Sequence, residues 1–555
     1  MPITRPAIQV ETLVIATTAF LLLAMNAPFW TAALRGREWA DPATWAISAS
    51  LFAVFGSLYF IGASLVATRH TVKPLLTGVL LLSALAAYYM NRYAVYFDRA
   101  MLRNVFATNY HEARELLGWD LARYLLAFGV IPSVLVWWPR LEKRPLRRAL
   151  AIRAGWVIVA LAVAVGIFML AFADLATLLR NRKEVRHLLT PGNVIAASVA
   201  NAFISAKRPN QPRLPVAADA ALGPEWKART RPLLFVLVVG ETARAQNFSL
   251  NGYGRQTNPQ LASKDIVNFD HAQACGTSTE VSLPCMFSPY GRRHYDEDSI
   301  LGHESLLHVL ARAGFDVRWR DNQSGCKGVC AGLPMDALDH AGVESLCAEG
   351  QCFDEILLHG MDTMVRDSKR NLFVVLHQLG SHGPAYFKRY PAIFKRFSPA
   401  CENEDLRGCS AGEILNAYDN SLLYTDYFLS RVISFLEAAQ MTHDTAMLYM
   451  SDHGESLGEG GLYLHGVPYA IAPDVQKHVP MVVWLSPAFQ RGYGVGQECL
   501  RGRASEPTGH DQLFHSILGV LDVRTTAYDP GMDLFAPCRT GGSGPAALKR
   551  AETAH

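Results

Sequence analysis

The chain has 555 residues, 50% of them hydrophobic, and a formal net charge of +3. So small a positive excess excludes the strongly basic surface typical of nucleic-acid-binding proteins. The apolar residues are concentrated in the first third of the chain, and the remainder has the mixed composition of a water-soluble domain. These observations predict a membrane anchor followed by a globular domain.

Five apolar runs in the first third are each long enough to cross a bilayer core, which requires about 20 helical residues. They cover residues 7–29, 45–67, 75–93, 121–138 and 155–175. The first run has a long apolar core, and no small-residue cleavage pattern clearly follows it, so we interpret it as a retained anchor. Residues 1–175 are therefore expected to form a transmembrane domain of five helices.

Basic residues mark two of the short connections between these runs. The connection between the second and third runs contains Arg69, His70 and Lys73. The connection between the fourth and fifth runs contains Arg140, Lys143, Arg144, Arg147, Arg148 and Arg153. Because short cytoplasmic loops carry an excess of Lys and Arg, both connections should be cytoplasmic. The N-terminus is then cytoplasmic, and the chain after residue 175 lies across the membrane.

Two further segments connect these parts. Residues 104–117, between the third and fourth runs, have mixed polarity and helical spacing, which predicts a helix on the outer membrane-water boundary. A simple interfacial connector is the alternative. Residues 176–231 are richer in Pro, Asn, Arg and Lys and are expected to form a bridging linker with one short helix near residues 194–204.

From residue 232 onward, short apolar runs alternate with helical stretches, which is typical of a mainly parallel sheet covered by helices. The predicted strands are residues 233–239, 315–319, 372–376, 446–450 and 481–485. Their nearly continuous hydrophobicity suits strands that are buried on both faces. This α/β domain should cover residues 232–545 and be followed by a C-terminal tail, residues 546–555.

All 10 cysteines lie between Cys275 and Cys538. An even number confined to the exported part predicts disulfides in an oxidising compartment. Proximity in sequence suggests the pairs Cys275–Cys285, Cys326–Cys330, Cys347–Cys352, Cys401–Cys409 and Cys499–Cys538. A zinc cluster is a weaker interpretation because the spacings are irregular and lack paired C-x₂-C knuckles.

The cysteine pair Cys275 and Cys285 encloses a short run with four hydroxyl side chains. Cross-linking so small a loop closes little chain entropy, so a better reason for the disulfide is to fix the orientation of one alcohol. The alternative is a surface disulfide loop that merely contains Ser and Thr. The spacing alone does not select one of the four hydroxyls.

Polar residues follow the predicted strands directly, where ligands of parallel sheets bind. They are Glu241, Thr242 and Arg244, then His377 and His382, and finally Asp452, His453, Glu455 and His465. Carboxylates and imidazoles that converge at such an edge indicate a metal site, with Glu241, Asp452 and His453 as three ligands. Zinc suits this set, while manganese and magnesium remain alternatives. A hydroxyl of the disulfide loop could then fill the open position and become a nucleophile.

The chain resembles the membrane-anchored lipid A phosphoethanolamine transferases of Gram-negative envelopes, whose catalytic domain is of the alkaline phosphatase and sulfatase type. The resemblance covers essentially the whole chain. It rests on four motifs that occur in order at residues 239–244, 275–288, 380–384 and 451–455. The fold that it implies is a helical five-span membrane domain plus a periplasmic α/β domain of the alkaline phosphatase/sulfatase superfamily.

The resemblance also implies site residues. It makes Thr279 the nucleophile and a zinc ligand beside Glu241, Asp452 and His453. Contacts to substrate phosphate are implied for Ser324, Lys327, His382 and His465, of which the two histidines are alternatively ligands of a second zinc. Contacts to the ethanolamine headgroup are implied for Asn104, Thr108 and Glu112. The family often has Asn before the serine that is Ser324 here, whereas this chain has Gln323, so no role carries over to Gln323.

The implied reaction moves phosphoethanolamine from phosphatidylethanolamine to a lipid A or lipooligosaccharide phosphate through an ester on Thr279. It would take place at the bacterial inner membrane, with the catalytic domain of a monomer in the periplasm, and would confer polymyxin resistance. Alternatives are phosphoglycerol transfer, transfer to a core sugar, and a catalytically inactive envelope sensor or scaffold. A sulfatase is disfavoured because the loop has no Cys/Ser-x-Pro-x-Arg run.

Overall fold

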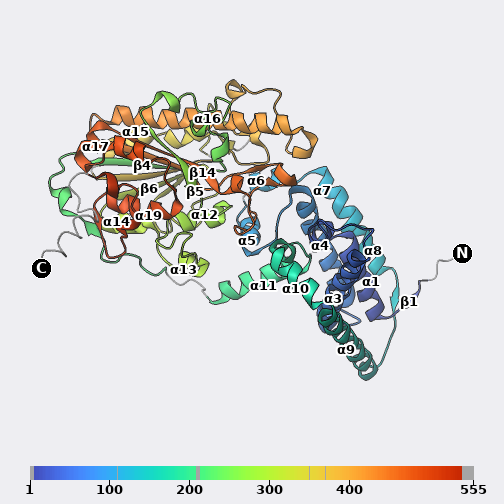
Figure 1. Cartoon of the computed structure of the whole chain (residues 1–555). Coiled ribbons are helices and arrows are strands. Elements are labelled where there is room, and N and C mark those ends of the chain that lie inside the picture. The colour runs from blue at the N-terminus through green and yellow to red at the C-terminus, as the bar shows by residue number, and fades with distance from the viewer. Residues whose placement is uncertain are drawn as a thin grey trace. The chain divides into compact units, whose positions relative to one another are not determined.

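A computed structural model describes residues 5–108, 110–207, 213–339, 341–348, 351–368 and 370–539 (Figure 1). The chain divides into two compact units. The membrane unit contains Met1–Arg103 and Leu117–Pro209, and the catalytic unit contains Asn104–Leu116 and Asn210–His555. The predicted boundary segment therefore packs with the catalytic unit, although it lies between membrane helices in the sequence.

The helices of the membrane unit agree in number with the predicted spans. Among the described residues, four helices are long and apolar enough to cross a membrane, and a bent helix pair brings the number to as many as five. The four are α3 (Pro42–Val66), α4 (Val72–Tyr93), the continuous run Trp119–Trp137 and α9 (Leu146–Leu170). The run Trp119–Trp137 comprises α7 (Trp119–Tyr124), the π-helix η1 (Leu125–Val130) and α8 (Ile131–Trp137).

The first predicted span differs from a single helix. It consists of α1 (Val10–Ala24) and α2 (Ala27–Ala33), which are bent by 63°. Asn26 at the break is fully buried, and its side-chain amide donates to the carbonyls of Leu21 at 2.8 Å and Thr190 at 2.9 Å. Its side-chain oxygen accepts from the Thr190 N–H at 2.8 Å. One side chain thus links the last turn of α1 to the backbone of Thr190, beside the break between α1 and α2.

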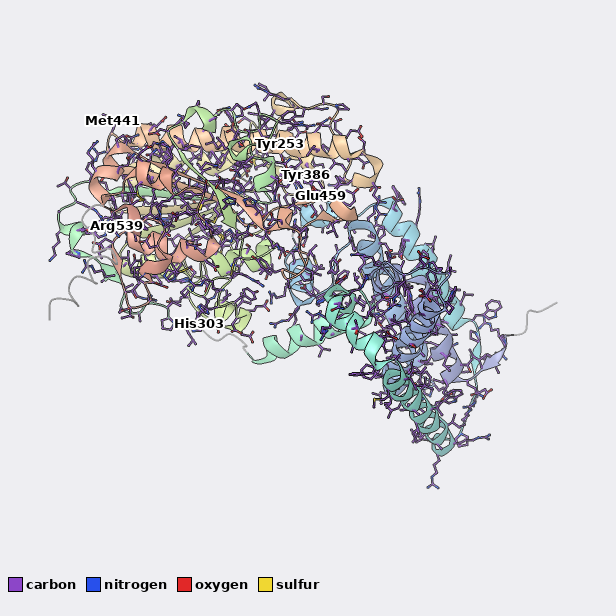
Figure 2. The ribbon with its side chains drawn as sticks, in the orientation of Figure 1. Tyr253, His303, Tyr386, Met441, Glu459 and Arg539 are labelled. Carbon is purple, nitrogen blue, oxygen red and sulfur yellow. A yellow bond between two sulfur atoms is a disulfide. The ribbon has the colours of Figure 1, made fainter. Side chains whose placement is uncertain are left out.

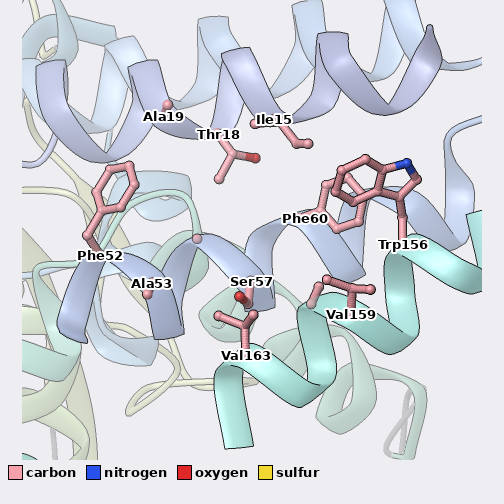
Figure 3. Close-up of a pocket in the computed structure, with 12 residues that line it drawn as sticks. Ile15, Thr18, Ala19, Phe52, Ala53, Ser57, Phe60, Trp156, Val159 and Val163 are labelled. Carbon is pink, nitrogen blue, oxygen red and sulfur yellow. The ribbon is translucent and has the colours of Figure 1, made fainter. Parts of the chain in front are cut away.

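Two other parts of the membrane unit differ from expectation. Helix α9 starts at Leu146, so Arg147, Arg148 and Arg153 lie on its first turns rather than in a loop. The expected linker contains most of α10 (Phe172–Asn181) and all of α11 (Gly192–Lys207), which is longer than the predicted short helix. An apolar pocket of about 250 Å³ lies between α1, α3 and α9, with Phe52 and Trp156 in its wall (Figure 3).

The catalytic unit is built on an eight-stranded sheet with the order β15-β5-β14-β11-β4-β10-β6-β7. The strands are β4 (Leu233–Gly240), β5 (Val267–Gln273), β6 (Asp316–Asp321), β7 (Met335–Ala337), β10 (Leu372–His377), β11 (Asp444–Ser451), β14 (His478–Leu485) and β15 (Thr508–Gly509). The run from β11 to β7 is parallel, and β14 is antiparallel to both of its neighbours. The predicted mainly parallel sheet is confirmed.

Helices cover both faces of this sheet because each central strand is apolar on both sides. Phe235, Leu237 and Val239 of β4 belong to one buried core, whereas Val236 and Val238 belong to the other. This is the alternation that a strand imposes on its side chains. The first core is closed by α12 (Thr279–Met286), α14 (Leu306–Ala313), α17 (Pro487–Tyr493) and α19 (His510–Val520), and the second by α15 (Met361–Asp367) and α16 (Ala411–Ala439) (Figure 1). Smaller helices are α13 (Glu297–Gly302) and α18 (Gln497–Gly502).

The cysteines form the same five pairs that sequence proximity suggested. Cys275 and Cys285 are both fully buried and pack against Ile300. The Cys275–Cys285 loop is therefore an internal part of the catalytic unit, and its interpretation as a mere surface loop is wrong.

Candidate active site

The site lies at the carboxyl ends of the two central strands. Strands β4 and β11 are parallel neighbours, with Gly240 opposite Ser451 in register. The next residue on each strand is a carboxylate, so Glu241 and Asp452 emerge side by side. His453 follows directly. The polar residues that follow these two strands in the sequence thus lie together at one edge of the sheet.

Thr279, the first residue of α12, faces this edge. Its hydroxyl donates to Glu241 Oε2 at 3.0 Å and lies 3.3 Å from His453 Nε2. The same imidazole nitrogen is 3.4 Å from Glu241 Oε1 and 3.4 Å from Asp452 Oδ2. All four residues are buried. The position of Thr279 at a helix N-terminus also favours negative charge on its oxygen, because backbone N–H groups point toward that end.

The geometry separates the four hydroxyls of the disulfide loop. Thr277 donates to the Val467 carbonyl at 2.7 Å, and Ser282 donates to the Asp452 carbonyl. Ser278 is the residue before α12, and its side chain makes no capping hydrogen bond. Among the described contacts, Thr279 is the loop residue whose hydroxyl reaches Glu241 and His453, whereas the Ser282 hydroxyl also lies 3.4 Å from Nδ1 of His510.

The residues at this edge fit a metal ion. One ligand atom each from Glu241, Asp452 and His453 lie within 4.8 Å of one another. Asp452 Oδ2 is buried and has no hydrogen-bond partner in the described part of the chain, which is costly for a carboxylate unless a cation compensates it. The Nδ1 of His453 lies 2.9 Å from the Gly454 carbonyl, so an Nδ1–H donated there leaves Nε2 as a lone pair facing the cluster. Burial lowers the pKa of His453, which favours the neutral imidazole that a metal binds.

Two more histidines adjoin the cluster. The ring of His465 is centred 4.4 Å from that of His453, and the ring of His382 is centred 5.4 Å from that of His465. Burial lowers the pKa of His465 to about 4 and that of His382 well below its ordinary value. Nδ1 of His465 is 3.0 Å from Glu455, whose own pKa burial raises to about 8. The structure thus brings both predicted phosphate-binding histidines next to the cluster as neutral rings.

Gln323 is a site residue that the sequence did not predict. Its side-chain amide donates to Glu241 Oε2 at 3.2 Å, and its side-chain oxygen accepts from Ser324. Lys327 Nζ donates to the Ser324 hydroxyl at 2.6 Å. Ser324 and Lys327 are therefore linked to the cluster through Gln323. No pattern in the sequence marked a glutamine here.

His510 was also missed. One ring nitrogen accepts from the Cys275 N–H at 3.0 Å, and the other lies 2.9 Å from the carbonyl of Ser451 on β11. The imidazole therefore ties the disulfide loop to the strand that supplies Asp452. The sequence gives little indication of His510, because this residue follows a two-residue strand that the apolar pattern did not reveal.

The predicted boundary helix is two helices, α5 (Arg99–Ala107) and α6 (Tyr110–Glu115). The hydroxyl of Thr108 donates to the carbonyl of Asn104 at 2.7 Å, which closes the last turn of α5. Among the contacts of the described residues, neither Asn104 nor Thr108 reaches Thr279. The side chain of Glu112 lies outside the described residues.

Known proteins resemble the chain over nearly its whole length. A family model described as phosphoethanolamine transferase EptA/EptB matches residues 54–203, and a sulfatase model matches residues 234–523. EptA of Salmonella typhimurium is 40% identical over 463 residues, which are 83% of this chain and 84% of the relative. Mcr-1, a phosphatidylethanolamine transferase from Escherichia coli, is 36% identical over 490 residues, covering 86% of this chain and 90% of the relative.

The chain belongs to the lipid A phosphoethanolamine transferase family. A solved structure of this family extends the likeness to the fold. The integral membrane lipooligosaccharide phosphoethanolamine transferase A of Neisseria meningitidis is 35% identical, with a TM-score of 0.91 over 96% of this chain and all of that one. The resemblance and the fold class predicted from the sequence are confirmed.

Proposed function

We propose that the protein is a zinc-dependent transferase that moves phosphoethanolamine from phosphatidylethanolamine to a phosphate of lipid A or lipooligosaccharide. The observation that carries the proposal is the Thr279 hydroxyl, 3.0 Å from Glu241 Oε2 and 3.3 Å from His453 Nε2. The names of the relatives EptA and Mcr-1 support the transferred group. A free phosphatase would not need a membrane anchor, whereas a transferase between two lipids gains from being held at the membrane surface.

In the first step, the Thr279 oxygen forms a bond to the donor phosphorus while the bond from phosphorus to the diacylglycerol oxygen breaks. A neighbouring neutral histidine would accept the hydroxyl proton of Thr279 as this bond forms and then pass that proton to the departing diacylglycerol oxygen. A zinc ion held by Glu241, Asp452, His453 and Thr279 would lower the pKa of the attacking hydroxyl and offset negative charge. The product of this step is a phosphoethanolamine ester on Thr279.

In the second step, an oxygen of the acceptor phosphate attacks the same phosphorus, and the bond to the Thr279 oxygen breaks. The attacking phosphate hydroxyl gives up its proton, a neighbouring histidine passes that proton to the Thr279 oxygen, and the acceptor carries a new phosphate-phosphate link. His382 and His465 would contact the phosphate in both steps, because their rings border the cluster. Lys327 and Ser324 would assist from the Gln323 side, since a lysine ammonium attracts phosphate as a point charge.

The remaining assignments concern location and substrate contacts. Asn104, Thr108 and Glu112 would contact the ethanolamine headgroup. The catalytic unit would lie in the periplasm and the N-terminus in the cytoplasm, because the basic connections between the apolar helices favour the cytoplasmic side. A monomer in the inner membrane would suffice, with the bilayer and its lipids as partners and no nucleic acid. The added ammonium would reduce the negative charge of the outer leaflet and weaken binding of cationic peptides such as polymyxin.

The test uses the full-length protein in membranes with separately labelled phosphatidylethanolamine and phosphatidylglycerol. Mass spectrometry of lipid A and of the core sugars then identifies the transferred group and its acceptor together. We expect label from phosphatidylethanolamine on lipid A phosphate, and a transient label on Thr279. Thr279→Ala should abolish both labels, while Thr277→Ala, which removes a hydroxyl bonded to the Val467 carbonyl, should retain them. Label arriving from the glycerol lipid alone would overturn the proposal.

A further inference from the structure

The boundary segment is attached to the catalytic unit through a buried carboxylate. Glu115, the last residue of α6, is only 7% exposed. Its Oε2 accepts a hydrogen bond of 2.6 Å from the guanidinium of Arg389, which is 3% exposed. The side-chain amide of Gln351 adds a longer contact of 3.5 Å to Oε1. Lys388 Nζ is a second cation near this carboxylate, 4.0 Å from Oε1, so the buried Arg389–Glu115 hydrogen bond is the shorter of two charged contacts.

The same guanidinium contacts three separate parts of the chain. Besides Nη2 on Glu115, Nη1 donates to the Gln351 side chain at 3.0 Å, and Nε donates to the backbone carbonyl of His382 at 2.7 Å. A guanidinium is a planar, rigid fork, so the three acceptors are held at fixed positions relative to one another. Lysine, with one ammonium, cannot reproduce this arrangement.

His382 belongs to the loop after β10, and its ring lies beside His465 at the metal cluster. This loop returns through Tyr386, which is labelled in Figure 2. The Tyr386 ring packs edge-to-face on that of Tyr418 of α16, with the ring centres 5.4 Å apart. Arg389 follows at the end of the loop and reaches back to His382. Arg389 therefore connects the end of the boundary segment to the backbone of a histidine in the site.

We propose that Arg389 is a positioning residue that couples the boundary segment, residues 104–116, to His382. Glu115 attaches the segment to Arg389, and the Arg389 side chain also binds the backbone carbonyl of His382. This inference rests on the proposed function: the segment would hold the ethanolamine headgroup while His382 contacts the phosphate of the same donor. The distance between the two recognition elements is then fixed by one guanidinium.

The two ends of this connection predict different kinetic effects. Loss of the Glu115 carboxylate releases the segment but leaves the Arg389 contact to His382 in place. Loss of the Arg389 guanidinium removes both its contact to Glu115 and its contact to the His382 carbonyl. Turnover of a donor that contains ethanolamine should therefore change when either Glu115 or Arg389 is substituted. Turnover of a phosphodiester without ethanolamine should change only when Arg389 is substituted.

The experiment compares Glu115→Gln, Arg389→Lys and the double variant in the full-length protein with two donors. The donors are phosphatidylethanolamine in vesicles and bis(p-nitrophenyl) phosphate, a soluble diester, and rates are normalised to the active fraction measured from the nitrophenolate burst. We expect Glu115→Gln to raise KM for phosphatidylethanolamine about tenfold, a usual size for coupling between sites, with kcat/KM for the soluble diester changed less than about twofold. Arg389→Lys should lower kcat/KM for both donors, and the double variant should be no worse than Arg389→Lys.

The matched control is the pair Glu304 and Arg312, another guanidinium that bridges a carboxylate and a backbone carbonyl, that of Val216 at 2.7 Å. Glu304→Gln and Arg312→Lys should leave both donors unaffected. Equal losses on both donors in Glu115→Gln, or no loss on phosphatidylethanolamine, would overturn the coupling. Failure of the wild-type protein to use phosphatidylethanolamine would instead refute the proposed function, and the soluble diester would still test the link from Arg389 to His382.

Discussion

Gln323 donates a hydrogen bond of 3.2 Å to Glu241 Oε2, the same oxygen that accepts the Thr279 hydroxyl. The amide therefore orients the carboxylate that accepts the Thr279 hydroxyl, and it does so without adding charge. Groups that orient metal ligands commonly affect metal affinity by about 10- to 100-fold when they are changed.

Exchange of this amide for a carboxylate should weaken the metal site. Gln323→Glu removes the N–H donor and places a second negative charge against Glu241, so the Glu241 carboxylate should turn away from the cluster, and we expect zinc content and transfer rate to fall. Gln323→Asn keeps the amide and should be milder. Zinc content by elemental analysis, measured beside the transfer rate, checks both variants. A Gln323→Glu protein with normal zinc content and rate would show that the hydrogen bond is dispensable.

Removal of the metal should lower both activity and stability. The carboxylates of Glu241 and Asp452 are buried close together, and without a cation they repel each other in a medium of low polarity. Dialysis against a chelator is expected to abolish transfer and lower Tm by several degrees, and added zinc should restore both. Asp452→Asn should bind less zinc and respond little to the chelator. Unchanged Tm and rate after verified removal of metal would contradict the assignment.

The Cys275–Cys285 disulfide should matter more for catalysis than for stability. It closes a separation of 10 residues, and an unfolded-state entropy argument gives about 2–3 kcal/mol for a loop of this size. The bond Cys401–Cys409 closes 8 residues and provides a matched control away from Thr279. We expect the double alanine variants of the two pairs to lose similar stability in thermal unfolding. Only the Cys275/Cys285 variant should lose transfer rate per folded molecule.

Asp426 should contribute stability to the catalytic unit that is lost as the pH rises from about 4 to about 7. Burial raises the pKa of Asp426 on α16 to about 7, although its oxygens accept from the N–H groups of Gln260 and Leu261 at 2.9 Å. In this range the folded state holds a proton that the unfolded state has released, so raising the pH favours unfolding, by up to a few kcal/mol. Asp426→Asn should flatten this part of the pH profile. An unchanged slope of Tm against pH in the variant would assign the effect to other groups.

The strands that carry the site were predictable because they are buried on both faces. The sequences of strands β4, β10 and β11 are nearly continuous apolar runs. The polar residues that follow these runs could therefore be recognised as lying at strand ends. Strand β5 was missed because it alternates polar and apolar residues and is buried on one side only. Glu241, Asp452 and His453 could thus be found by pattern, because each follows a recognisable strand.

Other features depend on contacts that sequence does not display. The contact that brings Thr279, among the four hydroxyls of the loop, to Glu241 exists only in the folded chain, and so does the contact of the Gln323 amide with the same carboxylate. The break between α1 and α2 interrupts an apolar run at Asn26. Thr190, the distant hydrogen-bond partner of Asn26, is 164 residues away in the sequence. These are tertiary effects, so local propensity and periodicity could not reveal them.

The bend at Asn26 has a consequence for biosynthesis. Its partner Thr190 leaves the ribosome only after the last long apolar helix, α9, has been made. Until then Asn26 has the Leu21 carbonyl but lacks both Thr190 groups, and the first helix pair is made before these two hydrogen bonds can form. A nascent chain that stops short of Thr190 would contain every long apolar helix and still lack the hydrogen bonds between Asn26 and Thr190 at the bend.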